Sequence, residues 1–174
     1  VNEIGRADKI VLPGVGAFDA GIRKLRNSGL WDAVKRHAVQ ERKPVLGICL
    51  GMQMLGRASE EGEEHGLALI PFENKRFCFE ADSPLKIPHM GWDLVTPILQ
   101  EDPLLRELPP LQRFYFVHSY HAVCDLEENV LMTCDFGYSF AAAVKNDNVY
   151  GVQFHPEKSH KFGMALLDNF ARRV

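Results

Sequence analysis

The chain has 174 residues, of which 46% are hydrophobic and 25% are charged. These fractions are typical of one globular domain, and they exclude a disordered, collagen-like or coiled-coil chain. The 20 basic and 23 acidic residues give a net charge of −3. This balance argues against nucleic acid as the main partner, because phosphate binding needs a surplus of basic residues.

The longest run without Asp, Glu, Lys or Arg extends from Pro44 to Gly56. It is too short and too rich in glycine for a membrane span. The 4 cysteines form no C-x-x-C pair, so neither a zinc ribbon nor a thioredoxin-like motif is predicted. No signal-peptide pattern opens the chain. We therefore expect a single domain over residues 1–174 in the reducing cytoplasm, with no membrane attachment.

The first third of the chain alternates strand and helix patterns. The apolar run from Lys9 to Leu12 ends at a Pro-Gly pair and predicts a buried strand, and Pro44 to Cys49 predicts a second one. Apolar residues at helical spacing predict helices over 19–27, 30–41 and 52–57. This order predicts a parallel sheet covered by helices.

The rest of the chain predicts short strands separated by turns. After an acidic loop at 60–66, strands are predicted at 77–79, 94–98, 114–119, 130–134, 140–144 and 149–154. The residues 146–148 are typical of a hairpin turn. Asp102 is expected to cap a short helix that ends by Leu108, and Ser159 is expected to cap the last helix.

The segment from Gly47 to Gly51 places Cys49 where a strand is expected to meet a helix. This is the pattern of a nucleophile elbow with cysteine in place of serine. The glycines permit a tight turn, the helix N-terminus favours a thiolate, and the N–H of Leu50 is expected to face an oxyanion. A lone cysteine is more often a small buried hydrophobe, but this context favours the catalytic interpretation.

A cysteine nucleophile needs a base and a group that orients the base. His155 and Glu157 follow a predicted strand, and Pro156 between them favours an extended backbone, so both side chains are expected on one side. By itself, His-Pro-Glu is weak evidence, since a surface histidine beside a solvated glutamate is common. Together with the elbow, it predicts a Cys49–His155–Glu157 triad.

The loop after the first strand is the expected source of a second oxyanion donor. In a parallel sheet this loop lies at the same edge as the elbow, so a backbone N–H of Val15 or Gly16 is the candidate. A plain glycine-rich connection is about equally consistent with the pattern. The loop lacks the full signatures of a phosphate-binding loop.

The elbow and the His-Pro-Glu motif resemble those of the class I (triad) glutamine amidotransferases. The finer motifs are similar to one branch of that family, the glutaminase subunits of imidazole glycerol phosphate synthase. These motifs lie at 12–18, 88–92, 116–120 and 155–159, and the resemblance covers essentially the whole chain. It implies a flavodoxin-like α/β fold, with a mixed, mainly parallel sheet flanked by helices and antiparallel additions in the second half.

The resemblance also implies the reaction. Cys49 would attack the side-chain amide of L-glutamine, release ammonia and leave a glutamyl thioester, which water activated by His155 would hydrolyse. The ammonia would pass to a cyclase subunit (HisF-like) in a heterodimer, for imidazole ring formation in histidine biosynthesis. A paralogous route, in which the ammonia amidates a sugar of a surface polysaccharide (O-antigen), stays open. No cofactor and no metal are implied.

The resemblance assigns two further sets of residues. The substrate-binding set is Gly51, Gln53, Glu61, His118, Ser119 and Tyr120. The set facing the partner subunit is His89, Met90, Trp92, Tyr115 and Lys158. Without the resemblance, Glu61 would be read as a solvated carboxylate, Trp92 as a core aromatic and Lys158 as an ordinary surface lysine.

Three other interpretations fit parts of the pattern. A cysteine peptidase with the same triad is the first, although papain-like enzymes have a different motif around the cysteine. A binding module that keeps the elbow as architecture is the second. A metal site at His118, His121 and Cys124 is the third, and carries little weight because these residues fall on a predicted strand and turn.

The family normally opens with a strand, a helix and a strand that nothing in this chain matches. If the 174 residues are the whole molecule, we expect an exposed sheet edge, poor solubility or a swapped partner, and impaired activity.

Overall fold

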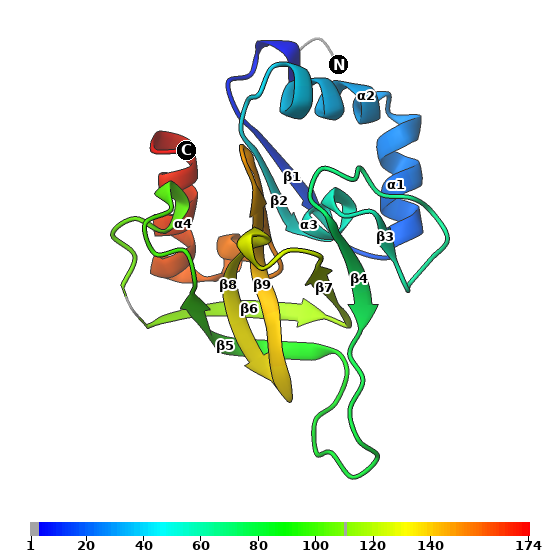
Figure 1. The fold of residues 1–174 in the computed structure, drawn as a ribbon, viewed down its shortest axis with the longest axis vertical. Helices are drawn as coiled ribbons and strands as arrows, with labels where there is room; N and C mark the ends of the chain where they lie inside the picture. Colours follow the sequence, from blue (N-terminus) through cyan, green and yellow to red (C-terminus); the bar gives the residue numbers. More distant parts are fainter. Residues whose placement is uncertain (1–3, 110) are drawn as a thin grey trace.

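A computed structural model describes residues 4–109 and 111–174 of the protein (Figure 1). The helical elements are η1 (Ile4–Arg6), α1 (Phe18–Asn27), α2 (Leu30–Lys35), η2 (Arg36–Gln40), α3 (Leu50–Leu55), η3 (Pro103–Leu105), η4 (Glu127–Asn129), η5 (Pro156–Lys158) and α4 (His160–Arg172). The strands are β1 (Ile10–Gly14), β2 (Val45–Cys49), β3 (Ala58–Ser59), β4 (Phe72–Arg76), β5 (His89–Pro97), β6 (Gln112–His118), β7 (Tyr120–Cys124), β8 (Val130–Phe136), β9 (Tyr138–Asn146) and β10 (Val149–Val152). No helix in these ranges is long and apolar enough to cross a membrane.

The ten described strands form one mixed sheet in the order β1-β2-β10-β9-β7-β4-β3, with β5, β6 and β8 off this path. The pairs β1–β2, β2–β10 and β3–β4 are parallel, and the other six described pairs are antiparallel. The predicted mixed sheet with antiparallel additions is therefore confirmed, but the expectation that the sheet is mainly parallel was wrong, because the strands after β3 pair mostly with antiparallel neighbours. The predicted hairpin turn at 146–148 joins β9 to β10.

Helices cover both faces of the parallel strands, with α4 on one side and α1 to α3 on the other (Figure 1). The side chains of β2 alternate between the two faces. Leu46 packs in the same core cluster as Leu166 and Phe170 of α4, whereas Val45 packs in the cluster that holds Leu55 of α3. Burial on both faces explains why β2 reads as a continuous apolar run.

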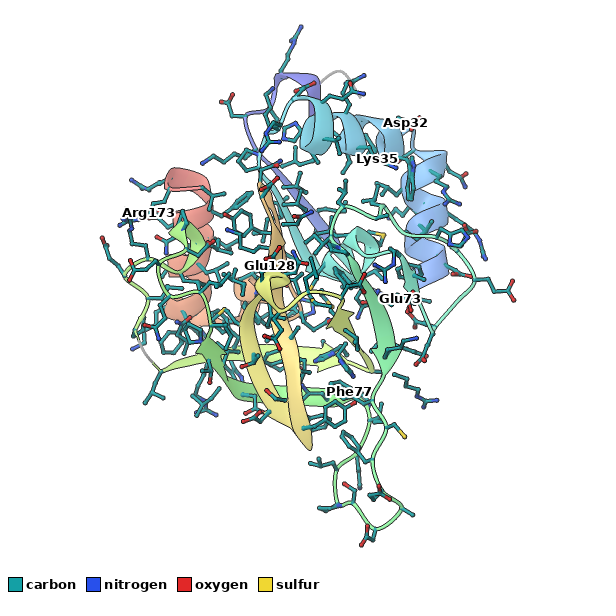
Figure 2. The ribbon with its side chains drawn as sticks, viewed as in Figure 1. Asp32, Lys35, Glu73, Phe77, Glu128 and Arg173 are labelled. Atoms are coloured by element: carbon teal, nitrogen blue, oxygen red, sulfur yellow. The ribbon has the colours of Figure 1, made fainter. Side chains whose placement is uncertain are left out.

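Several predicted boundaries were wrong for identifiable reasons. The strand expected at 77–79 is replaced by β4, whose inward positions include the polar Asn74, so the apolar pattern does not reveal it. Phe77 instead begins the loop after β4 (Figure 2) and packs against surrounding aromatic rings. Strand β7 was not predicted. The helix expected over 30–41 continues beyond Lys35 as a π-helical segment.

The two predicted caps have different outcomes. The Asp102 side chain accepts a hydrogen bond from the Leu104 N–H, as expected, but the helical turn that follows ends at Leu105. Ser159 occupies the N-cap position of α4 and makes no capping hydrogen bond with its side chain. Its hydroxyl is used in the candidate site instead.

Strand β1 lies at one edge of the described sheet, where it pairs with β2 alone. Val11 of this strand is 47% exposed. A groove of about 750 Å³ runs beside it, with apolar side chains such as Ile4, Leu12 and Leu25 in its walls. Within the described residues, one edge of β1 is therefore unpaired.

Candidate active site

Cys49 sits at the junction of β2 and α3 with φ 54° and ψ −114°, a backbone conformation that is rare for a residue with a side chain. The turn is possible because glycines flank it. A Cβ on Gly47 would lie 2.7 Å from the Gly51 carbonyl oxygen, and a Cβ on Gly51 would overlap the carbonyl oxygen of Leu12. The predicted elbow is therefore present, and Gly51, expected to bind substrate, serves the close approach of α3 to β1.

Strand pairing places the candidate base in the same cavity as Cys49. Strand β10 runs parallel to β2, with Val152 opposite Ile48, so the chain that continues to His155 leaves the sheet beside the elbow. His155 is buried, and its Nδ1 lies 2.7 Å from Oε1 of the partly exposed Glu157. Its buried Nε2 has no hydrogen-bond partner among the residues that the structure describes. This arrangement leaves Nε2 available as a base.

Burial controls the resting state of the nucleophile. It raises the pKa of the Cys49 thiol to about 11, and the nearby Glu157 carboxylate acts in the same direction. The N–H of Leu50 and the charge of Lys158 lower the pKa, but by less. The expected thiolate at the helix N-terminus is therefore not the resting form, because desolvation outweighs the helix contribution. A base must remove the thiol proton before attack.

The predicted oxyanion donors line the same cavity as the nucleophile. Val15, Gly16 and Leu50 border a cavity of about 350 Å³ together with Cys49 and His155. Gly14, one residue before Val15, is paired with Cys49 across β1 and β2, which fixes the loop beside the elbow. Gly16 has φ 95°, a conformation that favours glycine.

Five of the six residues expected to bind substrate also line this cavity, namely Gln53, Glu61, His118, Ser119 and Tyr120. Glu61 reaches it from the loop after β3, and its Oε2 accepts a hydrogen bond of 2.8 Å from the Phe18 N–H at the start of α1. Gln53 is buried in α3, and its Nε2 donates to the Tyr120 carbonyl at 3.3 Å. The cavity therefore joins nucleophile, base and a carboxylate.

His118 forms part of the cavity wall with both ring nitrogens engaged inside the protein. Its Nδ1 lies 2.8 Å from the Tyr120 carbonyl oxygen, and its Nε2 lies 3.1 Å from Nδ1 of His89. Burial lowers the pKa of His118 to about 3. The ring is therefore neutral and shapes the cavity as a fixed surface.

Two site residues were missed by the sequence analysis. Gln153 is fully buried, and its Nε2 donates a hydrogen bond to the Cys49 sulfur at 3.8 Å. Its side-chain oxygen Oε1 accepts a hydrogen bond from Nε2 of Gln53 at 3.1 Å. The hydroxyl of Ser159 donates to the His155 carbonyl at 2.6 Å and accepts from the Tyr115 N–H at 3.0 Å. Gln153 stands two residues before His155, and this period-2 spacing was the available signal.

The residues expected to face a partner divide into two groups. Met90, 62% exposed, and Trp92 lie on the outer face of β5, with Tyr115 opposite Trp92 on β6. The Lys158 ammonium lies 5.6 Å from the centre of the Tyr115 ring. His89 is different, because its side chain is only 3% exposed and points inward toward His118. It cannot line that surface directly in this structure.

Known proteins match this chain along nearly its whole length. The family model "Glutamine amidotransferase class-I" matches residues 3–174. Imidazole glycerol phosphate synthase subunit HisH 2 of Pseudomonas aeruginosa is 52% identical over 173 residues, which cover 99% of this chain and 84% of that protein. The protein of the same name from Methanococcus maripaludis is 48% identical over 171 residues, covering 98% and 83% respectively.

Solved structures share the fold at lower identity. A crystal structure of a glutamine amidotransferase has a TM-score of 0.69 at 17% identity, and the match covers 94% of this chain and 79% of that one. The glutaminase domain of Trypanosoma brucei CTPS with bound acivicin has a TM-score of 0.64 at 16% identity, and the match covers 99% and 74%.

Proposed function

Because this chain belongs to the class I glutamine amidotransferases, in the branch of imidazole glycerol phosphate synthase subunit HisH, we propose that it hydrolyses L-glutamine through a Cys49–His155–Glu157 triad. The observation that carries the proposal is one cavity that holds both Cys49 and His155, whose Nε2 is free of hydrogen bonds within the described residues. The ammonia is supplied to a cyclase subunit for imidazole ring formation in histidine biosynthesis.

The first half of the reaction forms a thioester. His155 Nε2 takes the Cys49 thiol proton, and Glu157 stabilises the resulting imidazolium through Nδ1. The sulfur attacks the side-chain amide carbon of glutamine, and the negative charge on the oxygen is bound by the N–H of Leu50 and an N–H of Val15 or Gly16. Collapse of this intermediate breaks the C–N bond, and His155 gives its proton to the departing ammonia.

The second half returns the enzyme to its starting state. His155 removes a proton from water, which attacks the thioester carbonyl. The C–S bond then breaks, glutamate leaves, and the sulfur recovers a proton from His155. Since Cys49 rests as a neutral thiol, each turnover begins and ends with the same protonation state.

The cavity orients glutamine by charge. The Glu61 carboxylate is the binding group for the α-ammonium, and its hydrogen bond from the Phe18 N–H holds it in place. Gln53, Ser119 and Tyr120 surround the same end of the substrate. His118 supplies a wall between them and the interior of the sheet.

The proposed partner surface is the outer face of β5 and β6, with Met90, Trp92, Tyr115 and the neighbouring Lys158. An exposed tryptophan and a half-buried tyrosine beside a cation are typical of an interface anchor. A heterodimer with a cyclase subunit would cover these rings and receive ammonia without loss to water. The rings lie next to the site, because Tyr115 pairs with His155 in an isolated bridge.

The first test is intact-mass analysis after incubation with 6-diazo-5-oxonorleucine, an electrophilic glutamine analogue, followed by peptide mapping. We expect one adduct on Cys49 that excess glutamine blocks. Cys49→Ala should abolish it, and Cys78→Ser, at an exposed cysteine, should retain it. Scattered labelling of several cysteines, or none, would contradict the proposed site.

The second test measures glutamate formation with and without a cyclase subunit and its ligand. We expect slow turnover by the chain alone and a large increase in the complex, with Cys49→Ala inactive toward glutamine but still able to form a complex that uses added ammonium. Activity of the complex only with a sugar acceptor would instead assign the chain to polysaccharide amidation.

A further inference from the structure

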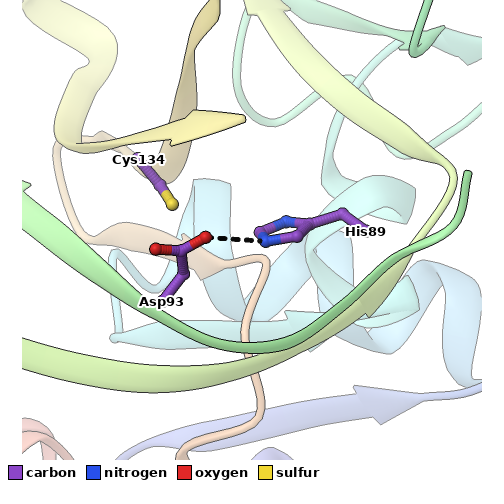
Figure 3. A group of neighbouring side chains, drawn as sticks. All are labelled: His89, Asp93 and Cys134. Atoms are coloured by element: carbon purple, nitrogen blue, oxygen red, sulfur yellow. Dashed lines mark hydrogen bonds and ion pairs between the residues drawn. The ribbon is translucent and has the colours of Figure 1, made fainter. Parts of the chain in front are cut away.

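A second cluster of reactive side chains lies in the sheet, away from Cys49. His89, Asp93 and Cys134 present an imidazole nitrogen, a carboxylate oxygen and a sulfur that all lie within 4.8 Å of one another (Figure 3). His89 and Cys134 are buried, and Asp93 is partly exposed. The cluster forms because His89 and Asp93 share the inner face of β5, and Cys134 of β8 is paired with Val95 on the same strand.

The hydrogen-bond pattern fixes which atoms carry protons. The Tyr120 carbonyl can only accept, so Nδ1 of His118 must donate to it. The neutral His118 ring then has a lone pair on Nε2, which accepts from Nδ1–H of His89. His89 consequently presents the lone pair of its Nε2 to Oδ2 of Asp93, 3.2 Å away. Two acceptors at this distance repel each other unless a cation lies between them.

A proton shared by His89 and Asp93 is one such cation, and a metal ion is another. The nearby Cys134 sulfur is the observation that distinguishes a metal from a proton. It is buried, and its single described hydrogen bond is a weak one of 4.0 Å to the Asp135 carbonyl. An imidazole nitrogen, a carboxylate oxygen and a sulfur are the three kinds of donor that zinc binds in proteins, and here they lie within 4.8 Å of one another.

We propose that His89 Nε2, Asp93 Oδ2 and Cys134 Sγ bind one Zn²⁺ ion, with a water molecule as the fourth ligand. The water enters from the side of Asp93, which is the exposed member of the cluster. On binding, the ion displaces the thiol proton of Cys134, which passes to solvent, so one proton is released for each ion bound. The metal does not change oxidation state.

The surroundings fit this assignment. A zinc-bound histidine usually donates its other ring N–H to a fixed acceptor, and His89 does so to His118. Asp93 is held by a 2.9 Å hydrogen bond from the Leu94 N–H to its other oxygen. The ion would join β5 to β8 and, through His89, fix the ring of His118 in the cavity wall. Its role is structural, because the cluster does not line the cavity that holds Cys49.

The test is titration with Co²⁺, which takes zinc sites and gives a charge-transfer band when a thiolate binds it. The protein carries Cys49→Ser, which removes the catalytic thiol as a competing ligand. We expect one equivalent of Co²⁺ to bind with a thiolate band, release of one proton, and displacement by Zn²⁺. Absence of the band, or of stoichiometric binding, would overturn the proposal.

Matched variants identify the ligands. In the same background, Cys134→Ser should abolish the band, and Cys78→Ser and Cys124→Ser should keep it. Asp93→Asn lies at a partly exposed position and is expected to fold, so it decides the assignment if Cys134→Ser does not. It should weaken Co²⁺ binding by more than the roughly 10- to 100-fold cost of losing an outer-shell partner. Unchanged affinity in Asp93→Asn, or an unchanged band in Cys134→Ser, would show that the metal binds elsewhere.

Discussion

The side-chain amide of Gln153, the first residue after β10, donates a hydrogen bond to the sulfur of Cys49 at 3.8 Å. The same side chain accepts from Gln53 at 3.1 Å, so it links the nucleophile to the residue at the substrate end of the cavity. Gln153 is fully buried, and its position is set by β10, which also leads to His155. The side-chain amide of Gln153 therefore connects the nucleophile Cys49 to Gln53 in the cavity wall.

Replacing Gln153 with Met removes this link and keeps the approximate volume. We expect glutaminase kcat to fall about tenfold, or ~1.4 kcal/mol, because the Cys49 side chain loses a positioning contact. Stability to urea should fall by about 1–2 kcal/mol, since Gln53 loses a buried acceptor. Gln100→Met, at an exposed position, is the control. Unchanged kcat in Gln153→Met would exclude a positioning role.

A substitution at Gly51 tests how closely α3 packs against β1 at the elbow. Gly51→Ala should destabilise the protein by about 3 kcal/mol or more, because the added Cβ would overlap the Leu12 carbonyl oxygen, which is backbone and cannot rotate away. Gly5→Ala is the matched control, since nothing lies within 4 Å of its added Cβ. Thermal melting of the two variants makes the comparison, and equal melting temperatures would contradict the close approach of α3 to β1.

A substitution at Glu157 tests whether its carboxylate orients and stabilises the base His155. Glu157→Gln keeps an oxygen that can accept from His155 Nδ1–H but removes the charge that stabilises the imidazolium. We expect kcat to fall roughly 10- to 100-fold, at or below the low end of general-base effects, because Glu157 acts through His155 and its carboxylate is partly exposed. KM should change little. Glu127→Gln, exposed in η4, should behave as the unmodified protein in the same assay.

The burial of the His118 ring predicts that the protein loses stability in acid. Burial lowers the pKa of the ring from 6.5 to about 3 in the folded protein, so the unfolded chain binds the proton more readily. The stability that the folded protein gains from the neutral His118 ring is therefore fully present above pH 6.5, and it is lost as the pH falls toward 3. Between pH 6.5 and 5 the loss should be about 2 kcal/mol.

Urea unfolding at several pH values measures how steeply the free energy of unfolding falls as the pH is lowered; this is the slope that His118 contributes to. His118→Asn should flatten it by that amount, although burial lowers the pKa of His37, His89 and His121 as well and their contributions will remain. Ser119→Ala, a neighbour without a titrating group, should shift the curve without changing its slope. A slope that survives His118→Asn in full would show that this ring titrates normally.

The parallel core, and the placement of Cys49 and His155 in one cavity, could be predicted because their signals are local. Continuous apolar runs fix β1 and β2, and two glycines around Cys49 fix the elbow. The position of His155 followed from chain order and strand direction. The confirmed family resemblance accounts for Gln53 and Glu61, since nothing local distinguishes Glu61 from other acidic residues of its loop.

The remaining features depend on contacts between distant segments. Gln153 reads as an ordinary polar residue in a strand until β10 is placed beside β2. The resting state of Cys49 depends on how much water the finished fold excludes, so the helix signal alone gave the wrong protonation state. The inward direction of His89 depends on the register of β5 with β6, which a short motif does not contain.

The pairing of β10 with β2 also orders events during synthesis. Cys49 and Gln153 are separated by 104 positions, so the nucleophile leaves the ribosome long before β10 and the base that follows it. Until that last strand inserts between β2 and β9, His155 is not held beside the elbow. An incomplete or unfolding chain thus lacks the assembled site, and we expect ammonia release only from molecules whose strand β10 is in place.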